Sequence, residues 1–297
     1  MGEDKITYYA KQHDLYPRKL LTLADAPKGI YVKGTLPSGN KPTVAIVGAR
    51  MCSEYGRVQA YEIAKYLSAH GVQVISGLAR GIDGHAHRGA LEGGTPTFAV
   101  LGCGLDICYP RQHIGLWQEI LEHGGGILSE YPLCTPPLRA YFPQRNRIIS
   151  GLADLVLVIE AKEKSGSLIT ADCALEQGKT VYALPGRIWD ALSFGCNYLI
   201  SQGAGILYSP ECILEELHID KSTTADKILE KKINFSLASD LKLVYSVLGF
   251  EPKNLDDLSK ELQISVEKLV TLLLQLELEG LVEKVGKNHY RKSYLIK

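Results

Sequence analysis

Residues 43–50 of the chain read TVAIVGAR, a run of apolar residues that ends in a glycine and an arginine. An apolar run without polar alternation is typical of a strand that is buried on both faces of a sheet. The same pattern, a short apolar run that a turn usually follows, returns along the chain. The further runs cover residues 72–75, 98–101, 127–128, 155–159, 181–184 and 206–208.

Helical stretches lie between these runs. We expect helices over residues 55–69, 84–92, 113–123, 170–178 and 211–217. Buried strands that alternate with helices predict a mostly parallel sheet with helices on both faces. The sequence therefore predicts an α/β fold, an extended Rossmann-like doubly wound sheet over residues 41–217. Residues 1–40 are expected to be a short, polar N-terminal lead-in with one small apolar element at Tyr31-Val32.

The C-terminal fifth of the chain has a different pattern. Residues 218–235 are polar and are expected to be a linker. Apolar residues at helical spacing predict helices over 238–248, 255–262 and 265–279, with Asn254 and Ser265 as N-caps. A hairpin follows over 281–291. Three helices and a hairpin predict a small C-terminal winged-helix domain over residues 236–297.

Composition limits what the protein can bind and where it resides. The formal net charge of the 297 residues is zero, and residues 41–217 hold 14 Lys and Arg against 17 Asp and Glu. Any attraction for anions must therefore come from local clusters. The seven cysteines are scattered and form no C-x-x-C pair, which favours a reducing compartment. No signal peptide and no apolar run of about 18 residues is visible, so we expect a cytoplasmic protein with no membrane span.

The first strand-to-helix loop argues against a dinucleotide cofactor. A dinucleotide fingerprint requires G-x-G-x-x-G, but residues 48–53 read GARMCS. A dinucleotide-binding domain also has an Asp or Glu at the end of the next strand, which binds the ribose. Here that strand ends at Ile75-Ser76-Gly77 and has no acidic residue. We therefore expect no cofactor.

The remaining loops at the carboxyl ends of the strands are typical of anion sites. Glycines supply backbone N–H groups that can approach a phosphate, and arginines supply charged forks. Aromatic residues interleaved with arginines add base stacking, which suits a single nucleic-acid strand. The loops are residues 76–88 (SGLARGIDGHAHR), 102–104 (GCG), 139–147 (RAYFPQRNR) and 162–170 (KEKSGSLIT).

Each of these features also has a purely structural explanation. Glycines can serve only to shape tight turns, and an arginine can be a surface ion-pair partner. Tyr141 and Phe142 can be core residues. Asp83, His85 and His87 can be considered as metal ligands, but histidines two residues apart do not share a helix face, and such residues more often orient a loop. The agreement of several loops at one sheet edge favours the functional interpretation.

At these residues the sequence resembles the DNA-processing protein A family, also called DprA or Smf. The resemblance covers roughly residues 15–217 and consists of many blocks in the family's order. The blocks are residues 46–50, 76–87, 100–106, 109–110, 129–132, 142–152, 160–161, 164–171, 174–178 and 185–186.

This resemblance implies a cytoplasmic binder of single-stranded DNA in natural transformation. It implies a homodimer that protects incoming strands and promotes loading of the RecA recombinase, without enzymatic activity of its own. Many relatives carry a helical N-terminal domain, for which the 40 residues before the sheet are too few. By position, the family's DNA contacts correspond to Gly48, Arg50, Arg80, Gly81, Arg139, Phe142, Arg145, Arg147, Lys164, Ser165, Gly166 and Ser167.

The C-terminal segment resembles the winged-helix domain of some relatives. Its third helix carries one lysine, Lys268, against Glu267, Glu277 and Glu279, a charge unsuited to a DNA groove. Basic residues are found on the predicted wing, where they can touch a phosphate backbone. We interpret the domain as a protein-contact module or one that touches DNA weakly.

Two other functions are considered. A nucleotide N-glycosidase of the lysine-decarboxylase-like family relies on P-G-G-x-G-T-x-x-E, and this chain has only Pro185-Gly186-Arg187. The alternative function is a sensor whose Rossmann domain binds a small nucleotide and whose winged helix reads duplex DNA.

Overall fold

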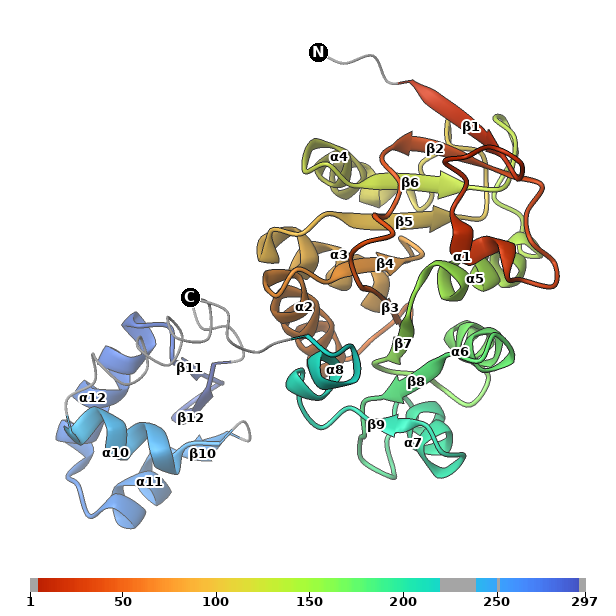
Figure 1. Ribbon diagram of the computed structural model, residues 1–297. Coiled ribbons are helices and arrows are strands. Elements are labelled where there is room, and N and C mark those ends of the chain that lie inside the picture. The colour runs from red at the N-terminus through yellow and green to blue at the C-terminus, as the bar shows by residue number, and fades with distance from the viewer. Residues whose placement is uncertain (1–4, 220–238, 250–251, 294–297) are drawn as a thin grey trace. The chain divides into compact units, whose positions relative to one another are not determined.

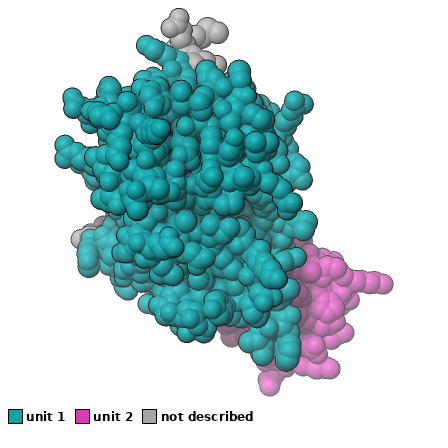
Figure 2. All heavy atoms as spheres, turned by 90° about the vertical axis from the view of Figure 1, so that its right-hand side faces the viewer, with its two compact units in different colours: residues 1–221 teal, residues 222–297 magenta. Residues whose placement is uncertain are grey.

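The computed structural model describes residues 5–219, 239–249 and 252–293, and the chain divides into two compact units, residues 1–221 and 222–297 (Figure 2). Residues 220–235, most of the linker that we predicted at 218–235, lie outside the described residues.

A nine-stranded sheet forms the centre of the first unit, in the order β1-β2-β6-β5-β4-β3-β7-β8-β9 (Figure 1). Seven of its strands are parallel to one another, and each corresponds to one of the apolar runs. They are β3 (Thr43–Val47), β4 (Gln73–Ser76), β5 (Thr97–Leu101), β6 (Gly126–Ser129), β7 (Leu155–Val158), β8 (Thr180–Ala183) and β9 (Gly205–Ile206).

Helices cover both faces of this sheet, which confirms the doubly wound α/β fold. One core contains side chains of α1 (Arg18–Leu21), α5 (Tyr141–Leu152), α6 (Gly166–Glu176) and α7 (Phe194–Ser201). The opposite face packs against α2 (Glu54–Ala69), α3 (Ile82–Gly93), α4 (Ile114–Glu122) and α8 (Glu211–Glu216), with a short 3-10 helix at Arg111–His113 before α4. In β3, Ala45 and Val47 face the first core, whereas Val44 and Ile46 face the other.

The strand order reverses between β3 and β7. From β3 the chain adds strands outward to β6, then returns to β7 and continues to β9 on the other side. In such sheets ligands bind beyond the carboxyl ends of the strands at this reversal point. The loops after β3 and β7, which include Gly48-Ala49-Arg50 and Lys164-Ser165, therefore lie where a ligand is expected.

Residues 1–40 are more than the lead-in that we expected. Strands β1 (Ile6–Ala10) and β2 (Gly29–Gly34) form an antiparallel pair, and β2 also pairs antiparallel with β6. Ile30 and Val32 are buried in the core, and the Tyr8 ring contacts the Tyr31 ring with centroids 4.6 Å apart. These two strands were not predicted because polar residues interrupt their apolar pattern, as is usual for antiparallel strands at a sheet edge, which bury only alternate side chains.

Residues 139–147, predicted as a loop ahead of a helix, are mostly helical. Helix α5 begins at Tyr141, so Phe142, Arg145 and Arg147 are helical residues. Phe142 and Arg145 are three residues apart and share a side, whereas Arg147 points to another. Pro143 is tolerated because the N–H groups of a first helical turn have no partner within the helix. The start of this helix was not predicted because its aromatic and arginine residues do not form an apolar stripe at helical spacing.

The second unit has the predicted winged-helix arrangement. Its helices are α10 (Ser239–Val247), α11 (Leu255–Leu262) and α12 (Val266–Leu278), and its three-stranded sheet has the order β10 (Lys253–Asn254), β12 (His289–Lys292), β11 (Val282–Lys284). The side chain of Asn254 accepts a hydrogen bond from the Asp256 N–H (2.9 Å), and that of Ser265 accepts one from the Lys268 N–H (3.4 Å). Both predicted N-caps are therefore present. Lys268 also pairs with Asp240 at 2.7 Å, so the one lysine of α12 is engaged within the unit.

Across the described ranges, no helix combines the length and the apolar character that crossing a membrane requires.

A buried histidine makes the stability of the first unit depend on pH. His87 of α3 is fully buried, and its Nδ1 lies 2.8 Å from Thr97 Oγ1. Burial lowers the pKa of His87 to about 3, from 6.5. Above pH 6.5 the ring is neutral in both states. As pH falls from 6.5 towards 3, the unfolded chain gains a proton that the folded one excludes, so stability is lost across this window.

We expect the free energy of unfolding to fall by up to about 1.4 kcal/mol per pH unit in that window because of His87 alone. Urea denaturation of His87→Asn and the wild type at several pH values measures this slope, which the substitution should flatten. His123→Asn, at an exposed position, serves as the control and should leave the slope unchanged. Equal slopes for the wild type and His87→Asn would contradict the assignment.

Candidate nucleic-acid interface

Two adjoining hollows lie at the carboxyl edge of the sheet. The larger has a volume of about 440 Å³ and is lined by the loops after β3 and β7 and by the start of α5. The smaller, of about 360 Å³, extends towards the loop after β4 and towards Tyr109-Pro110. Arg50, Phe142 and Arg145 line both hollows, so together they form one continuous surface.

Positive side chains surround this surface. Arg50, Arg139, Lys162 and Lys164 line the larger hollow and Arg80 lines the smaller, and all five are exposed. Among the described residues, the one carboxylate that lines the larger hollow is Asp83, which is buried. A chain of zero net charge thus carries a locally cationic edge, where low-dielectric walls strengthen the attraction for an anion.

The N-terminus of α6 opens into the larger hollow. Ser165 caps this helix, and its Oγ lies 3.4 Å from the Ser167 nitrogen and 2.8 Å from the Ser167 hydroxyl. No acidic residue lies in the first turn, and a Cβ added at Gly166 would meet no atom within 4 Å. Helix N–H groups and two hydroxyls with open space in front are a suitable site for a phosphate oxygen.

The N-terminus of α2 is occupied in another way. Glu160, buried after β7, accepts hydrogen bonds from the N–H and the hydroxyl of Ser53, the N-cap of α2. A Cβ at Gly56 would lie 2.3 Å from this carboxylate. The negative charge of Glu160 therefore takes the place at the first helix that a dinucleotide pyrophosphate would need.

Aromatic rings form the floor between the two hollows. The Arg50 guanidinium lies 5.1 Å from the centre of the Phe142 ring, and the Tyr109 ring lies 5.6 Å from Phe142 on a tilted plane. Gly102 permits this arrangement because its Cβ would lie only 3.2 Å from Phe142. Half-buried rings beside cations offer both a stacking surface and a phosphate partner.

Arg145 differs in character from the other predicted contacts. Its side chain is buried and donates hydrogen bonds to the carbonyl oxygens of Gly77 (2.9 Å) and Val100. Burial lowers the pKa of Arg145 to about 10. Because these carbonyls engage its guanidinium, the residue links α5 to the ends of β4 and β5 beneath the hollow rather than standing at its rim.

Asp83 acts on the same loop from the opposite side. Its carboxylate accepts hydrogen bonds from the N–H groups of Gly77 (3.1 Å) and Ala79 (3.4 Å). Burial raises the pKa of Asp83, and the positive charge of Arg145 opposes that shift. Leu78 lies between these bonds in a left-handed conformation (φ 55°) with its side chain in the core. Asp83 thus orients the loop that carries Arg80.

Arg147 lies away from the hollows. It pairs with Asp25 (2.7 Å) and Glu130 (2.6 Å), and its side chain is only 16% exposed. It therefore fastens α5 to the N-terminal segment. The sequence placed it beside Arg145 in one recognition loop, but two residues apart on a helix they point to different sides.

Two predicted glycines serve close backbone contacts. A Cβ at Gly48 would lie 2.6 Å from Ile82, and one at Gly81 would lie 2.3 Å from the Ala49 carbonyl. Gly81 also has φ 73°, which disfavours other residues. Gly81 lines neither hollow. Its role is to let the loops after β3 and β4 pack closely against each other.

The candidate metal ligands do not converge. Across the described ranges, no three or more His, Cys, Asp or Glu side chains form a group able to hold a metal ion. His87 bonds Thr97 inside the core, and Asp83 bonds the loop backbone.

Sequence reasoning left three contributors unassigned. Lys162 and Asn146 line the larger hollow and Tyr109 lines the smaller. Lys162 is the first residue of the predicted anion loop 162–170, so its positive charge and its position in the sequence could have identified it. Asn146 donates to the Gly166 carbonyl (3.1 Å), which joins α5 to α6, and this contact between distant segments has no sequence signal.

The fold and the site define the class of this protein as a doubly wound α/β domain with a cationic, aromatic-floored carboxyl edge, joined to a winged-helix unit. The sequence profile of the family described as DNA recombination-mediator protein A matches residues 7–218, and that of the DprA winged helix domain matches residues 232–286. This chain belongs to the DNA recombination-mediator protein A family, which is also called DprA or Smf.

Known relatives support this assignment. The chain is 42% identical to the protein Smf of Escherichia coli K12 over 94% of this chain and 75% of that protein. The X-ray structure of DNA processing protein A from Streptococcus pneumoniae superposes with a TM-score of 0.68 at 42% identity, covering 71% of this chain and 74% of that one. The structure of DNA processing protein A from Helicobacter pylori, which was solved to examine its single-stranded DNA binding mode, superposes with a TM-score of 0.64 at 30% identity. The superposition covers 72% of this chain and 97% of that one.

A graded glycine series tests the contact at Gly81. Gly81→Ala should lower the free energy of unfolding by about 1–3 kcal/mol or more, since it meets both a left-handed φ and the Ala49 carbonyl. Gly71→Ala, with φ 81° and open space, should cost about 1–2 kcal/mol. Gly39→Ala, with open space and ordinary φ, should stay within about 0.5 kcal/mol. Urea denaturation ranks the three, and a Gly81→Ala chain as stable as Gly71→Ala would refute the contact.

Proposed function

We propose that this protein binds single-stranded DNA along the carboxyl edge of its sheet. The observation that carries the proposal is the continuous surface of two hollows, cationic at the rim and aromatic at the floor. The cationic rim attracts the phosphates of a strand, and the aromatic floor offers a surface on which its bases can stack. Base faces are free to stack on side chains in a single strand, whereas a duplex keeps them inside its own stack.

Each predicted residue then has a role. Arg50, Arg80, Arg139 and Lys164 neutralise phosphates, and Lys162 joins them. Gly48, Ser165, Gly166 and Ser167 present backbone and hydroxyl groups at close range. Phe142 stacks on a base. Arg145, Arg147 and Gly81 hold these elements in place, and their effect on binding is indirect.

A relative supports the choice of ligand. The H. pylori DNA processing protein A, 30% identical and superposable over 72% of this chain, binds single-stranded DNA. The family description, recombination mediator, agrees with a protein that hands a strand to other proteins rather than one that transforms it chemically. We therefore propose a binder without catalytic activity, which protects strands that enter during natural transformation and promotes RecA loading.

We further propose a homodimer formed through the β9 edge of the sheet. Within the described residues, strand β9 pairs only with β8. Its residue Ile206 (48%) and Tyr208 (73%), which follows the strand, are both exposed. An unpaired edge strand with apolar side chains is suited to contact a second copy.

Binding should discriminate between strand types and depend steeply on salt. A gel-shift series with an oligothymidylate and a duplex of equal length should favour the single strand. Arg50→Ala and Lys164→Ala should each weaken binding about tenfold or more, because each loses a charge-assisted contact. Each should also reduce the slope of log affinity against log salt by about 0.7.

Lys28→Ala is the matched control, since it removes an exposed cation of the N-terminal segment that lines neither hollow. It should change neither affinity nor slope. A duplex preference, an affinity independent of salt, or an Arg50→Ala chain that binds like the wild type would refute the proposal.

The dimer is tested by sedimentation. Ile206→Asp should convert the dimer to a monomer, because it places a charge on the contact, whereas Ile114→Asp on α4, where Ile114 is 51% exposed, should not. A wild type that sediments as a monomer would refute the dimer.

The same preparations test RecA loading. The wild-type protein should accelerate assembly of RecA filaments on single-stranded DNA covered by a single-strand-binding protein, and an unchanged rate of assembly would refute this part of the proposal.

A further inference from the structure

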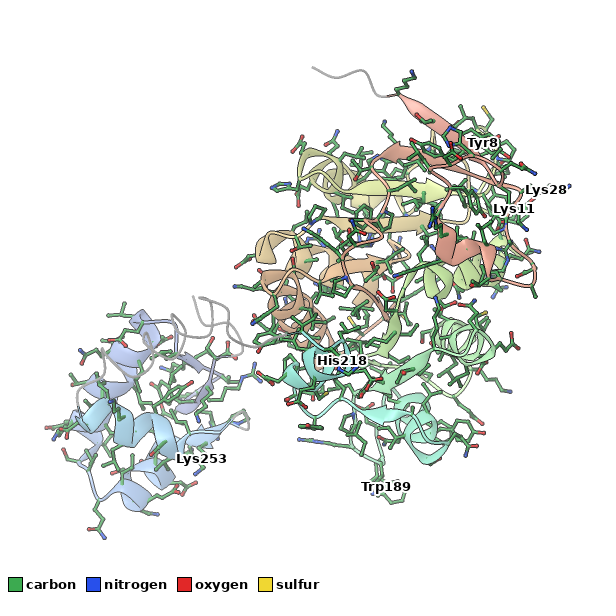
Figure 3. All side chains as sticks on the ribbon, in the orientation of Figure 1. Tyr8, Lys11, Lys28, Trp189, His218 and Lys253 are labelled. Atoms are coloured by element: carbon green, nitrogen blue, oxygen red, sulfur yellow. The ribbon has the colours of Figure 1, made fainter. Side chains whose placement is uncertain are left out.

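The loop between β8 and α7 presents an unexplained tryptophan. Trp189 is 93% exposed and its neighbour Ile188 is 78% exposed. Figure 3 shows Trp189 at the tip of this loop, pointing away from the body of the domain. Such a side chain contributes almost nothing to folding, although burying an indole is among the more stabilising contacts available to a protein.

The loop is nevertheless well ordered by its own contacts. The Asn197 side chain bonds both the N–H (3.1 Å) and the carbonyl (3.0 Å) of Gly186. Gly186 packs so closely on Ser193 that an added Cβ would lie 2.0 Å from the Ser193 hydroxyl, which closes the base of the loop. The Asp190 N–H bonds the Arg187 carbonyl (3.1 Å), so Trp189 lies in a tight turn at the tip. A fixed aromatic loses little entropy on binding.

The same loop is attached to the phosphate site. Leu192, three residues after Trp189, lines the larger hollow. The Leu192 carbonyl accepts a hydrogen bond from the Ala161 N–H (2.8 Å), and the Ala161 carbonyl accepts one from the Gly195 N–H (2.7 Å). Ala161 directly precedes Lys162. Trp189 is thus at most about 11 Å of chain from a residue of the hollow.

The sheet topology places the loop on a continuation of the groove. Strand β8 is parallel to β7, so the loop after β8 lies at the same edge as Lys162 and Lys164. Along this edge, Tyr109 and Phe142 lie towards the β5 side, Arg50 follows β3, Lys162 and Lys164 follow β7, and the loop of Trp189 follows β8. Aromatic residues therefore lie on both sides of the cationic centre.

From this arrangement, and resting on the proposed function, we propose that Trp189 is a second base-stacking residue for a single strand that leaves the larger hollow across the β8–α7 loop. The ligand is a flexible nucleic-acid strand rather than a mononucleotide, because Trp189 does not line the larger hollow and a mononucleotide held there would not extend to it. A second protein on the same loop is the competing occupant, and the experiment separates the two.

The chain contains two tryptophans, of which Trp117 is buried (4% exposed), so fluorescence can isolate Trp189. In full-length Trp117→Phe, the remaining emission should fall and shift to shorter wavelength as an oligothymidylate is added. Trp189→Phe, which keeps only Trp117, should show little change. The difference between the wild type and Trp189→Phe gives the same answer without depending on the folding of Trp117→Phe.

Affinity provides the second readout. Trp189→Ala should weaken binding of the oligothymidylate about 5- to 100-fold, the effect of losing one stacked base, and Trp189→Phe should recover most of it. The salt slope should remain that of the wild type because no phosphate contact is lost. Tyr8→Ala is the matched control: Tyr8 is an exposed aromatic (46%) on β1, at the opposite edge of the sheet from β9 (Figure 3).

The outcomes separate the two proposals. If the wild type does not bind the oligothymidylate, the proposed function fails and this inference fails with it. If the wild type binds but Trp189→Ala binds equally well and Trp189 emission does not change, only this inference is overturned. Emission that changes with protein concentration alone, and not with the oligothymidylate, would assign the loop to a second copy of the chain and would also overturn it.

Discussion

The hydrogen-bonded, buried guanidinium of Arg145 is the interaction on which the geometry of the carboxyl edge of the sheet depends. It bonds the carbonyls of Gly77 and Val100, at the ends of β4 and β5, from a helix that also carries Phe142. A buried cation is costly unless it is fully hydrogen-bonded, so its presence constrains all three elements to one geometry. The aromatic floor, the loop that carries Arg80 and the start of α5 are thereby held in fixed relation.

Charge is arranged locally rather than over the whole chain. Glu160 and Asp83 are buried and accept hydrogen bonds from backbone N–H groups, Glu160 at the start of α2 and Asp83 in the loop after β4. In contrast, Arg50, Lys162 and Lys164 of the same edge are exposed. The carboxylates thus act as internal fasteners, and their charges are partly compensated by N–H groups. This explains how a domain with more acidic than basic residues presents a cationic surface at one place.

The helical assignment of 141–152 shows where sequence patterns fail. Three arginines, an asparagine and two aromatics within residues 139–147 suggested a recognition loop, because their types are those of nucleic-acid contacts. In the structure the helix distributes them: Phe142 faces the hollow, Arg145 is buried beneath it and Arg147 pairs with Asp25 and Glu130. Residue types predicted the chemistry of this segment, but the direction of each side chain depends on helical geometry.

The sequence by itself determined the parallel sheet, the two-unit organisation and which loops meet at the carboxyl edge of the sheet. Apolar runs with glycine turns require buried strands, and parallel strands bring their carboxyl ends to one edge, so Arg50 and Lys164 could be placed together without coordinates. Only the tertiary structure decided which cations stay exposed, that β1 and β2 extend the sheet, and that the β8–α7 loop lies beside the larger hollow. These depend on contacts between distant segments, such as Ala161 with Leu192, which leave no periodic signal in the chain.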